Sequence, residues 1–236
     1  MNGSSEEDPK RAAAERAVAE YVESGMVLGL GTGSTVTFAV RKIGELLANG
    51  DLEDVRGIPT SERTADLARE VGIPLLALSE VRPRFTIDGA DEADPGLALI
   101  KGRGGALLRE KIVAHASEGG LVVVVDESKL VNALGQGSLP VEVEPFGWEV
   151  TLESLAALGC EPELRMDHED PDRPYVTDGG HYTADCRFAS ISDPNALEVE
   201  INRTPGALES GLFVGLARSV IVGRSGGTDI LEAEPR

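Results

Sequence analysis

The sequence predicts an α/β protein built on a mostly parallel, doubly wound sheet, with a smaller α+β domain inserted in it. Through the first half of the chain, short β-branched strand patterns alternate with helical patterns, which is the order typical of a parallel sheet with helices on both faces. Beyond residue 134 this alternation gives way to a different order. The 236 residues, 41% of them hydrophobic, suffice for one large or two modest domains with a well-buried core.

The elements of the larger domain follow one another in regular order. The first helix is expected to have Asp8 as its cap and Pro9 as its first residue, and to end near Val22 before Gly25. Strand patterns occupy residues 26–30, 55–58, 74–78, 84–87 and 121–125, and helical patterns occupy residues 36–47, 61–71 and 106–114. In such sheets, ligands bind at the carboxyl ends of the strands.

The smaller domain is predicted to comprise residues 135–208, so that the larger domain combines residues 1–134 and 209–236. Strand patterns at 139–143, 162–166 and 182–188 and helical patterns at 148–158 and 193–201 fit an α+β unit. The segments 212–214 and 220–222 are expected to return the chain to the large sheet.

The most informative segment sets acids and cations on glycine-containing loops. Asp88-Gly89-Ala90-Asp91-Glu92 directly follows the strand pattern at 84–87, and Lys101-Gly102-Arg103-Gly104-Gly105 comes shortly after it. Such groups at the end of a strand suit proton transfer on a small polar ligand, because glycine lets the ligand approach the backbone closely. Glu110 lies in the first two turns of the helix that follows. Taken alone, the same charges also fit a solvated turn before an amphipathic helix.

A second loop, Gly31-Thr32-Gly33-Ser34-Thr35, joins a strand pattern to a helical pattern. Backbone N–H groups at the start of the helix, together with the Thr32, Ser34 and Thr35 hydroxyls, suit a phosphate. The loop lacks both the lysine of a P-loop and the third glycine of a dinucleotide-binding loop. An ordinary helix cap is the alternative interpretation.

With both loops in view, the chain resembles the ribose-5-phosphate isomerases of type A. The matching motifs run in the family's order through most of the chain, from about Val18 to Gly223, and jointly they are far more specific than any one of them. They are Gly31-Thr32-Gly33-Ser34-Thr35, Asp88-Gly89-Ala90-Asp91-Glu92, Lys101-Gly102-x-Gly104, Arg109-Glu110-Lys111, Asp126-Glu127-Ser128-Lys129, Leu139-Pro140-Val141-Glu142-Val143 and Thr177-Asp178-x-Gly180.

This resemblance implies the interconversion of ribose 5-phosphate and ribulose 5-phosphate through an enediolate, with no cofactor and no metal. Glu110 would remove the proton from C2 and return it to C1, a role that suits a carboxylate shielded from water. Asp88, Asp91 and Lys101 would open the sugar ring and stabilise charge on the oxygens of the intermediate. The substrate-binding residues implied in the same way are Thr32, Gly33, Ser34, Thr35, Asp88, Gly89, Ala90, Asp91, Lys101, Gly102, Arg103, Gly104 and Lys129.

The chain departs from the family pattern at a few positions. Arg103 stands where many members have glycine, and we expect its side chain to point away from the pocket. Leu108 stands where a small hydroxyl residue is often seen, and His181 ends a segment that lies outside the proposed site.

The net charge of −19, from 41 acids and 22 bases, is the unusual global property. It argues against nucleic acid as a partner, and Lys101 and Lys129 must offset it locally if the substrate is anionic. We interpret the dispersed acids as adaptation to a salt-rich cytoplasm, as in halophilic archaea. An ordinary acidic protein is the alternative.

Further patterns limit the class of protein. No apolar stretch approaches the roughly twenty residues of a membrane span, and the N-terminus does not read as a targeting segment, so the expected location is the cytoplasm. Cys160 and Cys186 are expected to be semi-buried small hydrophobes rather than a disulfide. His115, His168 and His181 match no zinc pattern and are expected on the surface or in loops.

Exposed apolar residues in the smaller domain and the family resemblance together predict a homodimer or homotetramer. Two other classes of function stay open: a related enzyme on a similar fold, such as an amino-sugar phosphate deaminase or an acyl-CoA transferase, and a sugar-phosphate sensor without turnover. A deaminase is expected to use a histidine in its site, and none accompanies the acids here.

Overall fold

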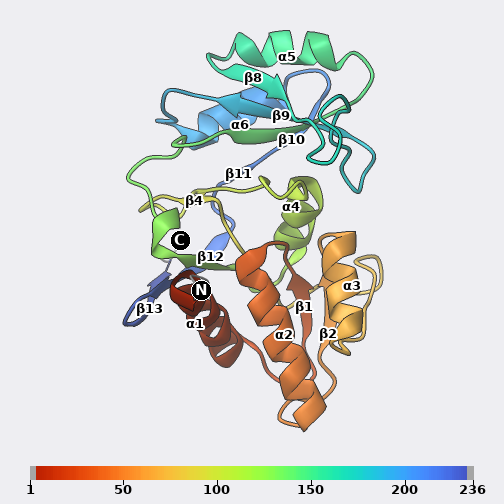
Figure 1. Cartoon of the computed structure of the whole chain (residues 1–236), viewed down its shortest axis with the longest axis vertical. Helices are drawn as coiled ribbons and strands as arrows, with labels where there is room; N and C mark the ends of the chain where they lie inside the picture. Colours follow the sequence, from red (N-terminus) through yellow and green to blue (C-terminus); the bar gives the residue numbers. More distant parts are fainter. Residues whose placement is uncertain (1–3, 233–236) are drawn as a thin grey trace. The chain divides into compact units, whose positions relative to one another are not determined.

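A computed structural model describes residues 4–232 and divides the chain into two compact units, and Figure 1 labels most of their elements. Unit 1 consists of Met1–Ala90, Arg109–Leu130 and Gly215–Arg236, and unit 2 of Asp91–Leu108 and Val131–Val214. The units differ from the predicted domains mainly in the segment Asp91–Leu108, which groups with the smaller unit. The predicted boundaries of the insertion itself remain a prediction.

Unit 1 contains a six-stranded sheet in the order β13-β12-β6-β3-β1-β2. Its parallel strands are β1 (Val27–Leu30), β2 (Arg56–Pro59), β3 (Phe85–Asp88), β6 (Leu121–Asp126) and β12 (Ala217–Arg224). The edge strand β13 (Gly227–Glu232) pairs with β12 in the antiparallel direction. The sheet confirms the predicted α/β fold with a mostly parallel sheet.

Helices cover both faces of this sheet, as the alternation of side chains along a strand requires. Leu28 and Leu30 on β1 belong to a core with residues of α1 (Ser4–Tyr21), α2 (Ser34–Asn49) and α3 (Glu62–Glu70). Val27, which points to the other face, packs with Val113 of α4 (Leu107–Ala116). Figure 1 shows α1 and α2 packed against each other on one face.

Two elements of unit 1 differ from their predictions. Helix α1 begins at Ser4 rather than at Pro9, because the missing N–H of Pro9 costs one backbone hydrogen bond without ending the helix. The predicted strand at 74–78 is reduced to one bridge between Leu75 and Gly57. Pro74 offers no N–H to a ladder, and the chain turns at Leu78.

Unit 2 contains a four-stranded antiparallel sheet in the order β10-β7-β9-β8. The strands are β7 (Leu139–Val143), β8 (Glu161–Leu164), β9 (Tyr182–Arg187) and β10 (Ala207–Ser210), and the helices are α5 (Trp148–Ala156) and α6 (Pro194–Asn202). Both helices contribute to a separate apolar core that includes Leu139, Leu155 and Ile201.

A three-stranded sheet, in the order β11-β5-β4, completes unit 2. Its strands are β4 (Glu92–Ala93), β5 (Leu99–Ile100) and β11 (Leu212–Phe213). The prediction that 212–214 rejoins the large sheet is therefore wrong. Gly211 makes the actual pairing possible, because a Cβ there would lie 2.1 Å from the Lys101 carbonyl oxygen.

The thiols of Cys160 and Cys186 are free, as predicted, and both are buried in the core of unit 2. A hydrogen bond with Cys160 and burial raise the pKa of Cys186. None of the helices within residues 4–232 has the length and apolar character that a bilayer span needs.

Candidate active site

Within unit 1, the Gly31–Thr35 loop lies directly on Asp88, because β1 and β3 are neighbouring parallel strands and both end at this edge. Asp88 is completely buried. Gly31 permits the approach, since a Cβ there would lie 2.2 Å from the Asp88 carboxyl group. Gly31, which belongs to the loop motif but was not among the predicted site residues, thus makes room for an acid of the protein.

Two backbone amides fix the orientation of the Asp88 carboxylate. The Thr32 N–H donates to Oδ1 at 3.1 Å, and the Gly89 N–H donates to the same oxygen at 2.7 Å. The first predicted catalytic acid is therefore held rigidly by the predicted substrate loop.

The hydroxyl of Thr32 faces inward, toward the start of α3. Its Oγ1 lies 2.8 Å from Thr60 Oγ1, 2.7 Å from Ser61 Oγ and 3.1 Å from Thr64 Oγ1. Ser61 is also the side-chain cap of α3. Thr60, Ser61 and Thr64 were not predicted as part of the site. Of these residues, only Ser61 could have been found from the sequence, as the expected N-cap of a helix. The cluster itself depends on tertiary contacts with Thr32.

The start of α2 keeps its first N–H groups free of side-chain capping. Gly33 is the N-cap residue, with φ 143°, and makes no side-chain capping hydrogen bond, while Ser34 is exposed. Thr35 is buried in the first turn. A helix start of this kind carries partial positive charge and suits an anion, which favours the phosphate interpretation of this loop.

Glu110 lies in the first turn of α4 and is 3% exposed. This burial fits the shielded carboxylate that the resemblance implies. Its neighbour Arg109 points elsewhere and forms an ion pair of 2.9 Å with Glu62 at the start of α3. In the Arg109-Glu110-Lys111 motif, Arg109 thus connects α4 to α3, and Glu110 is a buried acid.

Lys129 lies in a 3₁₀ helix, Glu127–Lys129, that follows β6. Asp126 caps this helix. Burial opposes ionisation of Asp126, but hydrogen bonds from Ser128 and the charges of Lys10 and Lys129 lower its pKa. Lys10 and Lys129 therefore both lie near Asp126. Lys10 was not among the predicted site residues, because no motif near Pro9 marks it.

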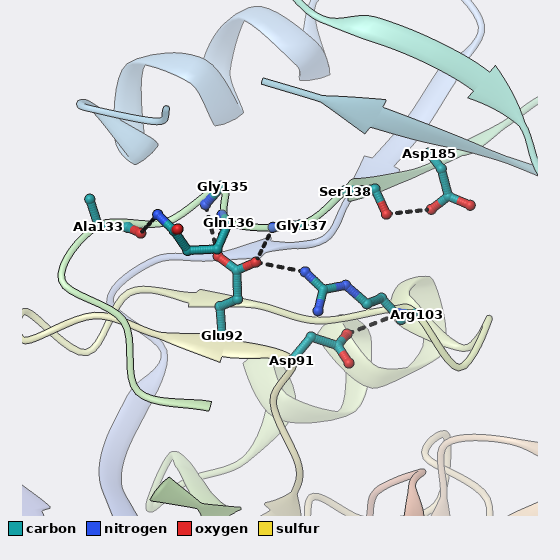
Figure 2. Close-up of polar contacts among 9 residues, drawn as sticks. All are labelled: Asp91, Glu92, Arg103, Ala133, Gly135, Gln136, Gly137, Ser138 and Asp185. Carbon is teal, nitrogen blue, oxygen red and sulfur yellow. Dashed lines mark hydrogen bonds and ion pairs between the residues drawn. The ribbon is translucent and has the colours of Figure 1, made fainter. Parts of the chain in front are cut away.

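Within unit 2, backbone pairing sets Asp91 beside Lys101. The Asp91 N–H donates to the Ile100 carbonyl at 2.8 Å. Lys101 is 2% exposed, and its ammonium group lies 5.4 Å from the centre of the Phe213 ring. Asp91 Oδ2 accepts a hydrogen bond of 3.0 Å from the Arg103 N–H, which Figure 2 shows. The structure thus brings together the predicted residues of this segment.

The side chain of Arg103 forms an ion pair of 2.6 Å with Glu92. Figure 2 shows this guanidinium directed at the carboxylate. The remaining loop residues Gly102 and Gly104 flank it in the sequence, and Gly102 is buried. Glu92 stands inside a predicted motif, yet its contacts were not foreseen, because the three backbone N–H groups that it accepts lie more than forty positions away in the sequence.

The three histidines lie on the surface or in a loop, as predicted. His115 on α4 and His168 are exposed, and His181 lies in a loop, where it is partly buried and 2.8 Å from Glu142. Within the described residues 4–232, no group of three or more His, Cys, Asp and Glu side chains is arranged to hold a metal ion.

The fold and these residues define an α/β enzyme that carries buried acids and an uncapped helix start at the carboxyl edge of a parallel sheet. Residues 56–227 match the family described as ribose 5-phosphate isomerase A, or phosphoriboisomerase A. The chain belongs to this family.

Relatives and solved structures agree with this assignment. Ribose-5-phosphate isomerase A of Gloeobacter violaceus is 56% identical over 94% of this chain and 95% of its own length. The protein of the same name from Thermococcus kodakarensis is 45% identical over 96% and 98%. A solved D-ribose-5-phosphate isomerase in complex with phospho-erythronic acid is 41% identical, with a TM-score of 0.93 over 98% of this chain and 100% of its own. Relatives come from bacteria, archaea and a plant, and they do not support an origin in a halophilic archaeon.

Proposed function

We propose that Glu110 is the base with which this chain, a ribose-5-phosphate isomerase, interconverts D-ribose 5-phosphate and D-ribulose 5-phosphate. Membership of the isomerase family over nearly the whole chain carries the assignment of the reaction. The burial of Glu110 at the start of α4 supports its role, because a general base works best when water does not compete for its proton.

The reaction moves a proton between two neighbouring carbons. Glu110 takes the proton from C2 of the open-chain aldose, which leaves an enediolate, and returns it to C1 to give the ketose. A second proton passes from O2 to O1, so that atoms and charge balance. The β4–β5 pairing sets Asp91 and Lys101 beside each other. These two groups are proposed to stabilise the charge that develops on O1 and O2.

Asp88 is proposed to act in ring opening together with Asp91, three positions away in the sequence. Its carboxylate accepts two backbone N–H groups, so it is held in one orientation for proton exchange with the sugar oxygens. The phosphate group of the substrate is proposed to bind at the uncapped start of α2 and to Lys129, and Lys10 would add positive charge there. Local cations of this kind are needed because the net charge of −19 repels an anionic substrate.

The test is an isomerisation assay on ribose 5-phosphate in molar KCl with EDTA, comparing the parent with Glu110→Gln. We expect metal-independent turnover by the parent and a loss of about a hundredfold or more in kcat for the variant, the scale of a removed general base. Glu118→Gln, which alters an exposed glutamate just beyond α4, is the matched control and should retain full activity.

Unchanged turnover in Glu110→Gln would refute the assignment of the base. A parent that binds ribose 5-phosphate without converting it would favour the sensor, and release of ammonia from an amino-sugar phosphate would favour the deaminase. Family membership argues against both.

The finer properties are part of the same proposal. The exposed side chains of Phe146 and Val150 in unit 2, which are 91% and 64% accessible, support assembly into a homodimer or homotetramer. Light scattering coupled to gel filtration checks this. The acidic excess supports adaptation to salt, and the cytoplasm is the proposed location, which cell fractionation would test.

A further inference from the structure

Glu92 is an acid of unit 2 to which the isomerase mechanism above gives no part, yet it is one of the most fully hydrogen-bonded acids described. It is 3% exposed. Oε2 accepts the N–H groups of Gly135 and Gln136 at 2.8 and 3.1 Å, and Oε1 accepts the N–H of Gly137 at 2.7 Å. The guanidinium of Arg103 adds a fourth donor at 2.6 Å. A buried carboxylate with four donors is a rigid fixed point.

Through its side chain, Arg103 links the buried Glu92 carboxylate to the Arg103 backbone. Its guanidinium packs against Gly137, where a Cβ would lie 2.3 Å from Nη2, so the side chain has little freedom. Its backbone N–H in turn donates to Asp91 Oδ2 at 3.0 Å. The residue therefore connects Glu92 to the carboxylate of Asp91, and Figure 2 shows both contacts.

Arg165 holds the same loop by its backbone carbonyls. Its Nη1 donates to the Gly102 and Arg103 carbonyls at 3.1 and 3.3 Å. Two further hydrogen bonds, of 2.8 and 2.6 Å, fix its guanidinium on Asp185. Asp185 accepts Ser138 Oγ at 3.2 Å. Since Ser138 follows Gly137, the contacts close a ring that returns to Glu92.

We propose that Glu92 is a positioning residue for the isomerisation, acting through Arg103 to hold the backbone N–H that orients the Asp91 carboxylate. This inference rests on the proposed role of Asp91. The Glu92 contact fixes the Arg103 side chain and the Arg165 contacts fix the neighbouring carbonyls, so loss of Glu92 frees the Arg103 side chain and lets its N–H move off Asp91. A misplacement of about 1 Å at a reacting group can cost on the order of a hundredfold in rate.

The test is a double-mutant cycle in the full chain, with kcat and KM measured for the parent, Glu92→Gln, Asp91→Asn and the double variant. We expect Glu92→Gln to lower kcat by about tenfold or more, with KM changed by less than about threefold, because it misplaces a reacting group rather than removing a binding contact. In the Asp91→Asn background, the same substitution should change kcat by less than about twofold, because its target is gone.

A merely structural role predicts a different pattern. If Glu92 only stabilises unit 2, Glu92→Gln lowers kcat by the same factor whether or not Asp91 is present, and that additivity overturns the proposal. Arg103→Met is the second variant, in case Glu92→Gln does not fold. It removes the side chain through which Glu92 is proposed to act, so it should lower kcat about as much as Glu92→Gln and show the same dependence on Asp91. Arg203→Met, which removes an exposed ion pair with Glu200 in the same unit, should leave turnover unchanged.

Hydrogen exchange gives a readout that does not depend on turnover. Glu92→Gln should speed amide exchange in residues 101–105 and 135–137 while the strands of unit 1 keep their protection. Unaltered exchange in both segments would overturn the positioning role. Absence of turnover in the parent would instead contradict the proposed function, so the two failures are distinguishable.

Discussion

At the scale of single residues, the site depends on close approach between groups that are far apart in the sequence. Gly31 and Asp88 are the clearest pair, because the glycine leaves the space that the carboxyl group fills. The sequence predicted a functional role for Asp88, but it did not predict that Gly31 contacts it. The inward-facing hydroxyl of Thr32 was likewise not foreseen, because its three partners come from a different segment.

Gly31→Ala should therefore destabilise the protein and impair turnover. The added methyl group would meet the Asp88 carboxyl at 2.2 Å, and overpacking of a buried position typically costs about 1–3 kcal/mol. Urea unfolding measures the loss of stability, and the isomerase assay measures the effect on kcat. Gly226→Ala is the matched control, since a Cβ there meets nothing within 4 Å. Equal stability of the two variants would contradict the packing described for Gly31.

At the scale of elements, the hydrophobic pattern predicts the longer strands, whereas the shortest strands depend on tertiary pairing. The strands β1, β6 and β7 were predicted closely, because each is a buried run bounded by turn residues. The two-residue strands β4, β5 and β11 are too short for any pattern, yet they set Asp91 beside Lys101. The 74–78 pattern met strand criteria but found a partner only at Leu75.

The short helix after β6 gives a prediction on pH. The pKa of Asp126 is lowered in the folded protein, so its charge contributes stability above the ordinary pKa of 3.8 and loses it as the pH falls through the lowered value. Asp126→Asn keeps an acceptor for the Ser128 N–H but removes the charge. We expect the variant to be less stable at pH 7 by less than about 1 kcal/mol, with the difference shrinking toward pH 3.

Urea unfolding of parent and variant across this pH range checks the sign. Asp66→Asn, which alters an exposed ion pair with Arg69, is the control and should show little effect at any pH. A difference that grows toward acid would mean that Asp126 is not stabilised as an anion.

At the scale of the whole molecule, charge is the dominant property. With a formal charge of −19, like charges repel across the surface at low salt. The screening length falls from about 30 Å at 0.01 M to about 3 Å at 1 M, so salt removes most of this repulsion.

We therefore expect the midpoint of thermal unfolding to rise between 0.01 and 1 M KCl, and KM for the anionic substrate to change as the average repulsion is screened. Calorimetry and the isomerase assay at matched pH measure both effects. Sucrose at equal osmolality is the control for effects that do not involve charge. A midpoint that is independent of KCl would argue against salt adaptation of this chain.

The amino-acid sequence was enough to predict the alternation of strands and helices, the motifs of the isomerase family and the acids and loops proposed to carry out the reaction. These properties are local, because periodicity and turn residues act over a few positions. The tertiary contacts were needed to show that Gly31 packs on Asp88, that Lys10 and Lys129 both lie near Asp126, and that Arg103 contacts both Glu92 and Asp91. Such contacts join distant segments, and their partners are selected by packing and by the need to satisfy buried charge, which no local pattern encodes.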